Sequence, residues 1–265
     1  MNLSEEQIYE IQIGLEKGLD VTIYAKPEFN WLQMNQIRLG LERGLDISIY
    51  TDTKFDATQM LQIRRGLEAG VDVTIYNKIK YDWEQMYEIR EGLVAGIDVT
   101  IYANPEFDRS QMEEIRKGLK SKVDVSVYAD PKYVWDQMME IREGLQDGLD
   151  VSTFTNPALS RFQMEQTREG LELNLDVSAC ANSEYDPAQM RETIKSLELN
   201  LDMTDYVDPK YDWAQMRELR RGLECGVDVS IYADPEINWY QMREIRMTLK
   251  ALKDLIYYAH SNVMY

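Results

Sequence analysis

The sequence has a single histidine, His260, only two cysteines, and no apolar run long enough to cross a membrane. One histidine cannot build a histidine-ligated metal site or a catalytic triad, and no glycine-rich phosphate-binding fingerprint is present. Cys180 and Cys225 lie too far apart to indicate a zinc knuckle or a disulfide framework. The opening residues, MNLSEEQIYEIQ, lack the apolar core of a signal peptide. We therefore expect a cytoplasmic protein that is not an enzyme and that holds no metal or cofactor.

Basic residues are also scarce. The chain carries 29 Lys and Arg residues against 47 Asp and Glu residues, a formal net charge of −18. Such a surface repels nucleic acid and anionic membranes, and it favours partners with basic surfaces. The acidic excess is strongest in residues 133–236. We expect no direct binding to nucleic acid or to a membrane.

What the sequence does contain is one motif, repeated ten times with a period of 26 residues and marked by a glutamine: Gln7, Gln33, Gln59, Gln85, Gln111, Gln137, Gln163, Gln189, Gln215 and Gln241. A period kept without insertion or deletion is typical of a solenoid, whose repeats bury their apolar faces by stacking on one another. We predict a single array over residues 1–265. Residues 1–28 form an N-terminal capping repeat, 29–236 form eight central repeats, and 237–265 form a C-terminal capping repeat.

Each repeat carries the signals of a long helix. Three residues before the glutamine stands a good N-cap residue in nine repeats, as in Asp56 before Gln59, and the two match a capping box. Eleven residues after the glutamine, Gly, Asn or, once, Lys stands where a helix end needs a left-handed backbone. Between these signals, Met, Ile and Leu columns such as Met86, Ile89 and Leu93 are predicted to face the core.

The following stretch, DVSIYA, has the β-propensity of a strand, but its columns favour a second, short helix that is partly 3₁₀. The apolar Val and Tyr columns, such as Val73 and Tyr76, lie three residues apart, whereas the Ile column between them includes Asp205. Asp72 and its counterparts would cap this helix. The predicted fold class is therefore an all-α solenoid of ten 26-residue repeats, each with a long and a short helix. A strand at DVSIYA is the alternative.

Two flanks of the long helix are predicted to meet between repeats. Small residues such as Gly92 follow the glutamine by seven positions, and arginines such as Arg90 and Arg116 follow it by five. We expect the arginine stems to lie over the small flank of the neighbour, with the guanidinium groups near carbonyls or aspartate caps. The alternative is an arginine ladder that binds phosphates or carboxylates.

Two columns supply candidate partner-binding residues. The first helical position is tryptophan in five repeats and Arg or Pro in others, so we expect it to be accessible: Trp31, Trp83, Trp135, Trp213 and Trp239. There Trp would either cover the neighbouring repeat or anchor a partner, as it does at binding hot spots. Three residues after the glutamine runs a column of acids or amides, expected on an outer face that is solvated or meets a basic partner: Glu88, Glu114, Glu140, Glu192, Glu218 and Glu244.

The seventh and eighth repeats depart most from the pattern. Cys180 stands where Tyr is usual, Ile194 where Arg is usual, and Asp205 lies on the short helix. Such departures mark either a special interface or ordinary drift among repeats. Loops such as VDPKYDW faintly resemble a calcium site, but Asp212 at the helix start suits a capping role better.

The phrase QMxEIRxGLxxGLDVSIYADP resembles a short helical repeat of uncharacterised bacterial proteins, some of them linked to mobile elements. The likeness covers essentially the whole chain. It implies no activity, although the mobile-element link raises the expectation of interference with host defence.

From the columns we predict a non-enzymatic scaffold that binds a protein, one with a basic surface, through an extended helical face. Association between copies stays open. The alternative is an acidic decoy that inhibits a nucleic-acid-binding enzyme such as a restriction or CRISPR nuclease.

Overall fold

The computed structural model describes residues 3–263, which form helices, turns and loops with no strand among them. Residues 1, 2, 264 and 265 of the predicted array lie outside this part. The long helices are α1 (Glu5–Glu16), α2 (Trp31–Glu42), α3 (Ala57–Glu68), α4 (Trp83–Val94), α5 (Arg109–Ser121), α6 (Trp135–Gln146), α7 (Arg161–Glu172), α8 (Pro187–Glu198), α9 (Trp213–Glu224) and α10 (Trp239–Val263). The short 3₁₀ helices are η1 (Val21–Ile23), η2 (Ile47–Ile49), η3 (Val73–Ile75), η4 (Val99–Ile101), η5 (Val125–Val127), η6 (Val151–Thr153) and η7 (Val229–Ile231).

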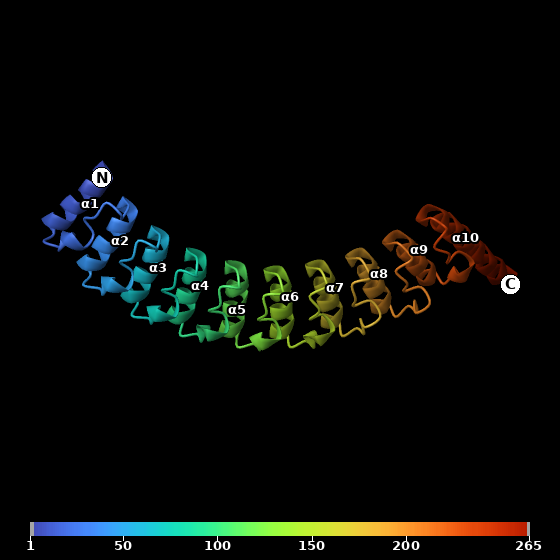
Figure 1. Ribbon diagram of the computed structural model, residues 1–265. Helices are drawn as coiled ribbons and strands as arrows, with labels where there is room; N and C mark the ends of the chain where they lie inside the picture. Colours follow the sequence, from blue (N-terminus) through green and yellow to red (C-terminus); the bar gives the residue numbers. More distant parts are fainter. Residues whose placement is uncertain (1–2, 264–265) are drawn as a thin grey trace. The chain divides into compact units, whose positions relative to one another are not determined.

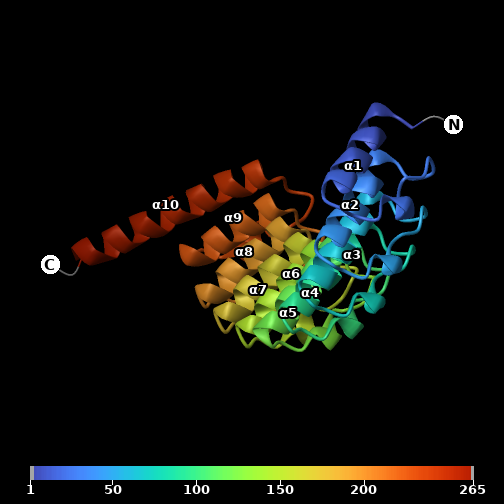
Figure 2. The ribbon, with the colours of Figure 1, turned by 90° about the vertical axis from the view of Figure 1, so that its left-hand side faces the viewer.

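The chain divides into two compact units, residues 1–138 and 139–265, with the boundary inside α6. In the first unit, α1 to α5 pack one against the next in chain order, and in the second, α7 to α10 do the same (Figure 1). In the second unit α10 continues well past the end of α9 (Figure 2). Sequential packing of long helices with 3₁₀ turns between them confirms the predicted all-α solenoid, and the strand alternative for DVSIYA is wrong.

Local sequence sets both ends of the long helices, as predicted. The capping box is present in α1 to α5 and in α7 to α9. In α3, Asp56 Oδ1 accepts the Gln59 N–H at 2.8 Å, and Gln59 Oε1 accepts the Asp56 N–H at 2.9 Å. After the helices, Gly70 and Asn174 adopt φ of 71° and 57°, the left-handed conformation that Gly and Asn tolerate best.

The glutamine has a second role that the sequence analysis did not include. Its amide N–H also binds the next repeat: Gln59 Nε2 donates to the carbonyl oxygen of Tyr81 at 2.7 Å. Tyr81 directly precedes the cap of α4, so the start of one helix is bonded to the start of the next. The same bond, with the acceptor 22 residues after the donor, is made by Gln7, Gln33, Gln85, Gln111, Gln163, Gln189 and Gln215.

The tyrosine of each regular repeat packs under its own long helix. The Tyr76 ring is fully buried, and its hydroxyl donates to the carbonyl oxygen of Gln62 at 3.1 Å. A Cβ on Gly66 would overlap this hydroxyl and lie 2.7 Å from a Val73 methyl group, so the small flank makes room for the tyrosine. The prediction that this flank faces the arginine column did not include the tyrosine of the same repeat; at Gly170, which has no such tyrosine, the nearest neighbours do include Ile194 from the arginine position of the next repeat.

The seventh and eighth repeats lack this glycine–tyrosine pair, and both have a turn in place of the 3₁₀ helix. Cys180 is buried in the tyrosine position of repeat seven. In repeat eight, Ser196 replaces the glycine, and Tyr206 is only partly buried. The capping aspartate persists, because Asp202 still accepts the Thr204 N–H at 3.1 Å. Departure from the sequence pattern thus coincides with loss of the short helix.

We expect the Gln59→Glu substitution to lower the free energy of unfolding by about 3 kcal/mol at neutral pH, because the carboxylate keeps the capping bond but cannot donate to Tyr81. Burial next to a carbonyl raises the pKa of the introduced carboxyl group above its unfolded value. The loss should therefore be smallest below the unfolded pKa, where the protonated group donates, and should grow as the pH rises through the folded pKa.

The matched control is Gln241→Glu in α10, where the glutamine is exposed and makes only its capping bond. Urea unfolding at pH 4 and pH 7 measures both variants. Equal losses at the two positions would contradict the bridging role.

Candidate functional site

The tryptophan column is exposed in both units. Trp31, Trp83 and Trp135 are 43%, 42% and 46% exposed in the first unit, and Trp213 and Trp239 are 44% and 39% exposed in the second. Each occupies the first position of its helix, outside the buried Met and Ile columns. About half of each indole therefore packs on the protein, and the remainder is available to a partner.

Open grooves run beside two of these tryptophans, and their charges differ. Trp31 borders a groove whose other wall is α1, with Glu5, Glu6 and Tyr9. The two glutamates, both in the first turn of α1, make this groove acidic.

Trp213 borders a basic groove of about 490 Å³ between α8 and α9. Arg191 and Lys195 line it from α8, and Arg217 lines it from α9 with its guanidinium 4.9 Å from the indole centre of Trp213. The buried Nε of Arg217 has no hydrogen-bond partner among the described residues. An acidic or hydrogen-bond-accepting group of a partner suits this groove.

The glutamate column differs from the prediction of an outer face. Its members Glu88, Glu114, Glu140, Glu192 and Glu218 are all buried. Glu244 alone of the predicted set is exposed, because it lies on α10, which has no following repeat in the described part. The expectation of a solvated row is therefore wrong for five of the six residues, and a partner cannot reach their carboxylates.

The buried carboxylates and amides are held by the arginine column of the next repeat. Arg116 Nε donates to Glu88 Oε2 at 2.9 Å, and Arg90 Nε donates to Gln62 Oε1 at 3.1 Å. The same pairing over 28 residues joins Arg38 to Glu10, Arg64 to Gln36, Arg168 to Glu140, Arg220 to Glu192 and Arg246 to Glu218. These arginines thus join neighbouring repeats, and Arg38 and Arg64 also pair with the glutamate four residues on in their own helix. In the bonds named here the acceptors are side chains of the glutamate and amide column, in place of the carbonyls and aspartate caps that were predicted.

Burial and ion pairing oppose each other in the ladder. Burial lowers the pKa of the Arg116 guanidinium, but attraction to Glu88 outweighs that effect and raises this pKa. For Glu88 burial prevails: it raises the pKa of the carboxyl group, and the adjacent Arg116 guanidinium offsets only part of that effect. In repeat eight the pattern is rearranged, because Ile194 occupies the arginine position and is buried. Arg191 takes over its role and donates through Nε to Gln166 Oε1 at 3.2 Å.

Accessible negative charge lies instead in the aspartates that cap the short helices, which sequence analysis assigned to capping alone. In the repeats before α10 these are all exposed: Asp20, Asp46, Asp72, Asp98, Asp124, Asp150, Asp176, Asp202 and Asp228. Hydrogen bonds from the Thr74 hydroxyl and backbone N–H hold the pKa of Asp72 below its usual value. Such a carboxylate stays ionised at neutral pH. One exposed aspartate per repeat was visible in the sequence as an uninterrupted column.

Metal binding, thiol chemistry and membrane insertion have little structural support among the described residues. Among residues 3–263 there is no cluster of three His, Cys, Asp or Glu side chains placed to hold a metal ion. Burial raises the pKa of the Cys180 thiol to about 11, which keeps it protonated and poorly reactive. Within that same part of the chain, every helix is too short or too polar to span a bilayer. No protein-family model, curated protein or solved structure matches the chain.

The arginine ladder leads to a prediction about substitutions of Glu88, because other repeats carry glutamine at the same position. Glu88→Gln should change the free energy of unfolding by less than about 1 kcal/mol, because Gln36 and Gln62 occupy this position and accept equivalent arginine bonds. Glu88→Ala should cost about 2 kcal/mol, since it leaves Arg116 partly buried without its acceptor. Chemical denaturation of both variants measures the difference, and a larger loss for Gln than for Ala would refute the structural role of the ladder.

Proposed function

We propose that this protein is a non-enzymatic scaffold that binds another protein through the tryptophan column. The observation that carries the proposal is the recurrence of a half-exposed tryptophan at one helical position in five repeats. Tryptophan is enriched at binding hot spots because its large, rigid ring buries much apolar area at low entropic cost. A column of such rings on regularly packed helices offers several anchors to one extended partner.

The framework behind the column favours this role. Within each unit, glutamine amides bond one helix start to the next, as from Gln59 to Tyr81, and arginines join one helix to the preceding one, as from Arg116 to Glu88. Anchors held on such a framework are positioned before the partner arrives, which lowers the entropic cost of binding. Trp31 and Trp83 lie on α2 and α4, two packing steps of about 8–10 Å apart. A matching partner therefore presents two apolar pockets about 16–20 Å apart.

The charges of the two grooves indicate which residues a partner would present there. The acidic groove at Trp31 suits a basic residue, in keeping with the net charge of −18. The groove at Trp213 suits an acidic residue. We infer that the partner carries both signs, and that a uniformly basic surface fits only the groove of the first unit.

The scaffold proposal is tested with the protein immobilised in a bacterial lysate and washed at about 0.05 M and then 0.5 M salt, which screens exposed charge pairs. We expect the specific partner to survive the second wash, and a Trp83→Ala, Trp135→Ala double variant to lose it at least tenfold. The control is an Ile79→Ala, Ile101→Ala double variant, which removes exposed apolar side chains of the same unit outside the column. Retention unchanged in the tryptophan variant, or no retained protein at all, would contradict the proposal.

An acidic decoy for a nucleic-acid-binding enzyme is the second candidate, and the exposed aspartate column favours it. One carboxylate per repeat, about 8–10 Å from the next, is far sparser than the charge of duplex DNA, one per about 1.7 Å. The column therefore suits a basic patch better than a closely matched DNA groove. The sequence resemblance to repeats linked to mobile elements supports a nuclease of a host defence system as the target.

The decoy predicts a different pattern of loss. An Asp72→Asn, Asp98→Asn, Asp124→Asn variant keeps the caps, since Asn caps helices as well as Asp does, but it removes three accessible charges. Under this candidate the variant should bind its target at least tenfold more weakly at 0.05 M salt, and duplex DNA should compete with the wild-type protein. Unchanged binding by the variant, or a lack of competition by DNA, would exclude the decoy.

A further inference from the structure

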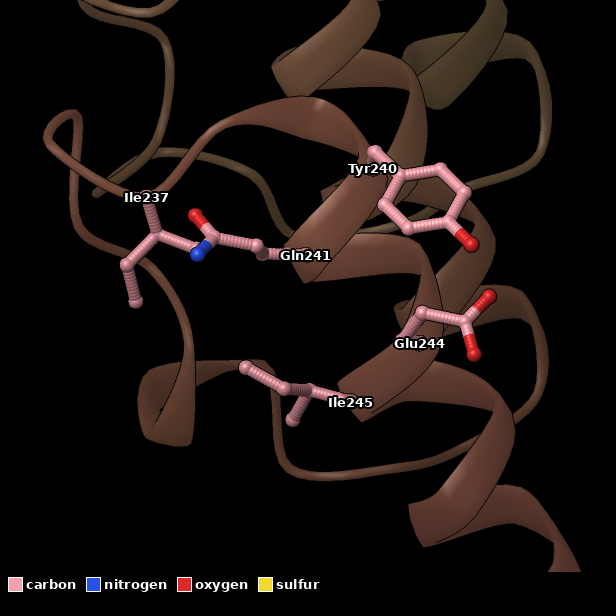
Figure 3. Close-up of a pocket in the computed structure, with 5 residues that line it drawn as sticks. All are labelled: Ile237, Tyr240, Gln241, Glu244 and Ile245. Carbon is pink, nitrogen blue, oxygen red and sulfur yellow. The ribbon is translucent and has the colours of Figure 1, made fainter.

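The last helix carries an exposed surface that the proposed function does not use. α10 has 25 residues, against 12 in α9, and no later repeat in the described part of the chain covers its outer side. An open pocket lies there, lined by Ile237, Tyr240, Gln241, Glu244 and Ile245. Figure 3 shows Gln241 extending toward Ile237, while Tyr240 and Glu244 project from the other side of the helix. In earlier repeats the glutamine position is occupied by bonding to the next repeat.

An apolar stripe continues from this pocket along α10. Tyr240, Met247, Leu255 and Tyr258 are 56%, 49%, 64% and 70% exposed, and their spacing places them on one side of the helix. A solenoid usually ends in a repeat with a polar outer face, which keeps it soluble. The position of Met247 is charged in seven other repeats: Arg65, Glu91, Lys117, Glu143, Glu169, Lys195 and Arg221. The stripe therefore belongs to α10 and is not inherited from the repeat.

Within the stripe, Met247 and Leu255 are placed symmetrically about Ala251, an exposed residue, and the counterpart of Tyr258 is the charged Glu244. Met247 and Leu255 lie four residues to either side of Ala251, and Glu244 and Tyr258 lie seven. In an antiparallel pair of α10 helices, Met247 meets Leu255 of the partner subunit and Glu244 meets the partner's Tyr258. The two Ala251 side chains face each other at the centre, where small residues let the helices approach closely. We propose that α10 packs antiparallel on α10 of a second copy of this chain and forms a two-fold dimer.

A second α10 is a better occupant than α1 of another copy. α1 has only 12 residues and would cover about half of α10, leaving Leu255 and Tyr258 exposed. Contact between α1 and α10 would also be heterologous, and such contacts build open chains of copies unless the ring closes. Two α10 helices match in length, about 37 Å at ~1.5 Å per residue. Glu244 and Asp254 border the stripe, but each faces an uncharged residue in the antiparallel pair, Tyr258 of the partner subunit and the partner's Thr248.

The dimer is tested by sedimentation of the full chain at concentrations from about 1 to 100 μM, a range that detects dimers of ordinary affinity. We expect a mass twice the 31.1 kDa of one chain, and at least a tenfold weaker dimer for Leu255→Glu. Because Leu255 is 64% exposed, this variant should keep its circular dichroism and its Tm. Leu199→Glu, at a 50% exposed position on the second unit outside α10, is the matched control and should not change the mass.

A cross-link distinguishes this arrangement from others. Glu244→Cys chains mixed with Tyr258→Cys chains, both in a Cys225→Ser background, should oxidise to a disulfide between copies, because the antiparallel pair brings residue 244 next to residue 258, whereas a parallel in-register pair brings each residue next to its own counterpart. A chain that sediments as a monomer at the highest concentration would overturn the proposal. So would an association that survives Leu255→Glu but disappears with Ile8→Glu on α1, since that result assigns the contact to the two ends of the array. Of the column, α10 carries Trp239 alone, and none of these substitutions replaces a tryptophan, so the outcomes are distinct from those of the Trp83→Ala, Trp135→Ala test.

Discussion

The two-sided amide of the repeated glutamine is the interaction on which the rest of the fold depends. Its oxygen accepts the backbone N–H of its own cap residue, and its nitrogen donates to the carbonyl that precedes the next cap. Glutamate could perform the first task but not the second, which accounts for glutamine in the repeats whose amide bonds to a following repeat. Because the amide is buried, both of its groups must be satisfied, and only one placement of the next helix achieves this.

With the helix starts held in this way, the arginine ladder and the glycine–tyrosine pairs fill the space between and beneath the helices. The ladder removes many charges from the surface, so the net charge of −18 overstates the role of the glutamates and understates that of the capping aspartates. The faces open to a partner are therefore the tryptophan column, its grooves and the aspartate column. Repeat seven keeps its glycine, Gly170, but has Cys180 in place of tyrosine. Repeat six has Phe154 in place of tyrosine and keeps its 3₁₀ helix, so the short helix coincides with a buried aromatic ring at this position, which repeat seven lacks.

Much of the fold could be read from the sequence, because its signals are local. Capping residues, left-handed positions and apolar columns each specify a neighbouring backbone conformation, and the structure shows them as predicted. The errors concern side chains that act between elements. Glu88 looked like a surface residue because a helical projection gives an angle but not the neighbour that covers it. The acceptor of the Gln59 amide is the Tyr81 carbonyl, 22 residues away, and no local sequence pattern indicates this bond. The absence of glutamate from the glutamine column was the one available signal for it.

The fixed reach of these bonds has a consequence for how such an array changes over evolution. Apart from the Arg191–Gln166 bond, which spans 25 residues, the glutamine and arginine bridges described above join residues 22 or 28 positions apart, so excising or duplicating one regular repeat restores the same donor and acceptor at the new junction. Unequal recombination can therefore alter the number of repeats without leaving a buried polar group unpaired. The insertion of a few residues would shift the donor from its acceptor. The number of repeats can thus change one at a time, and each added or removed repeat adds or removes one position at which a tryptophan can contact a partner.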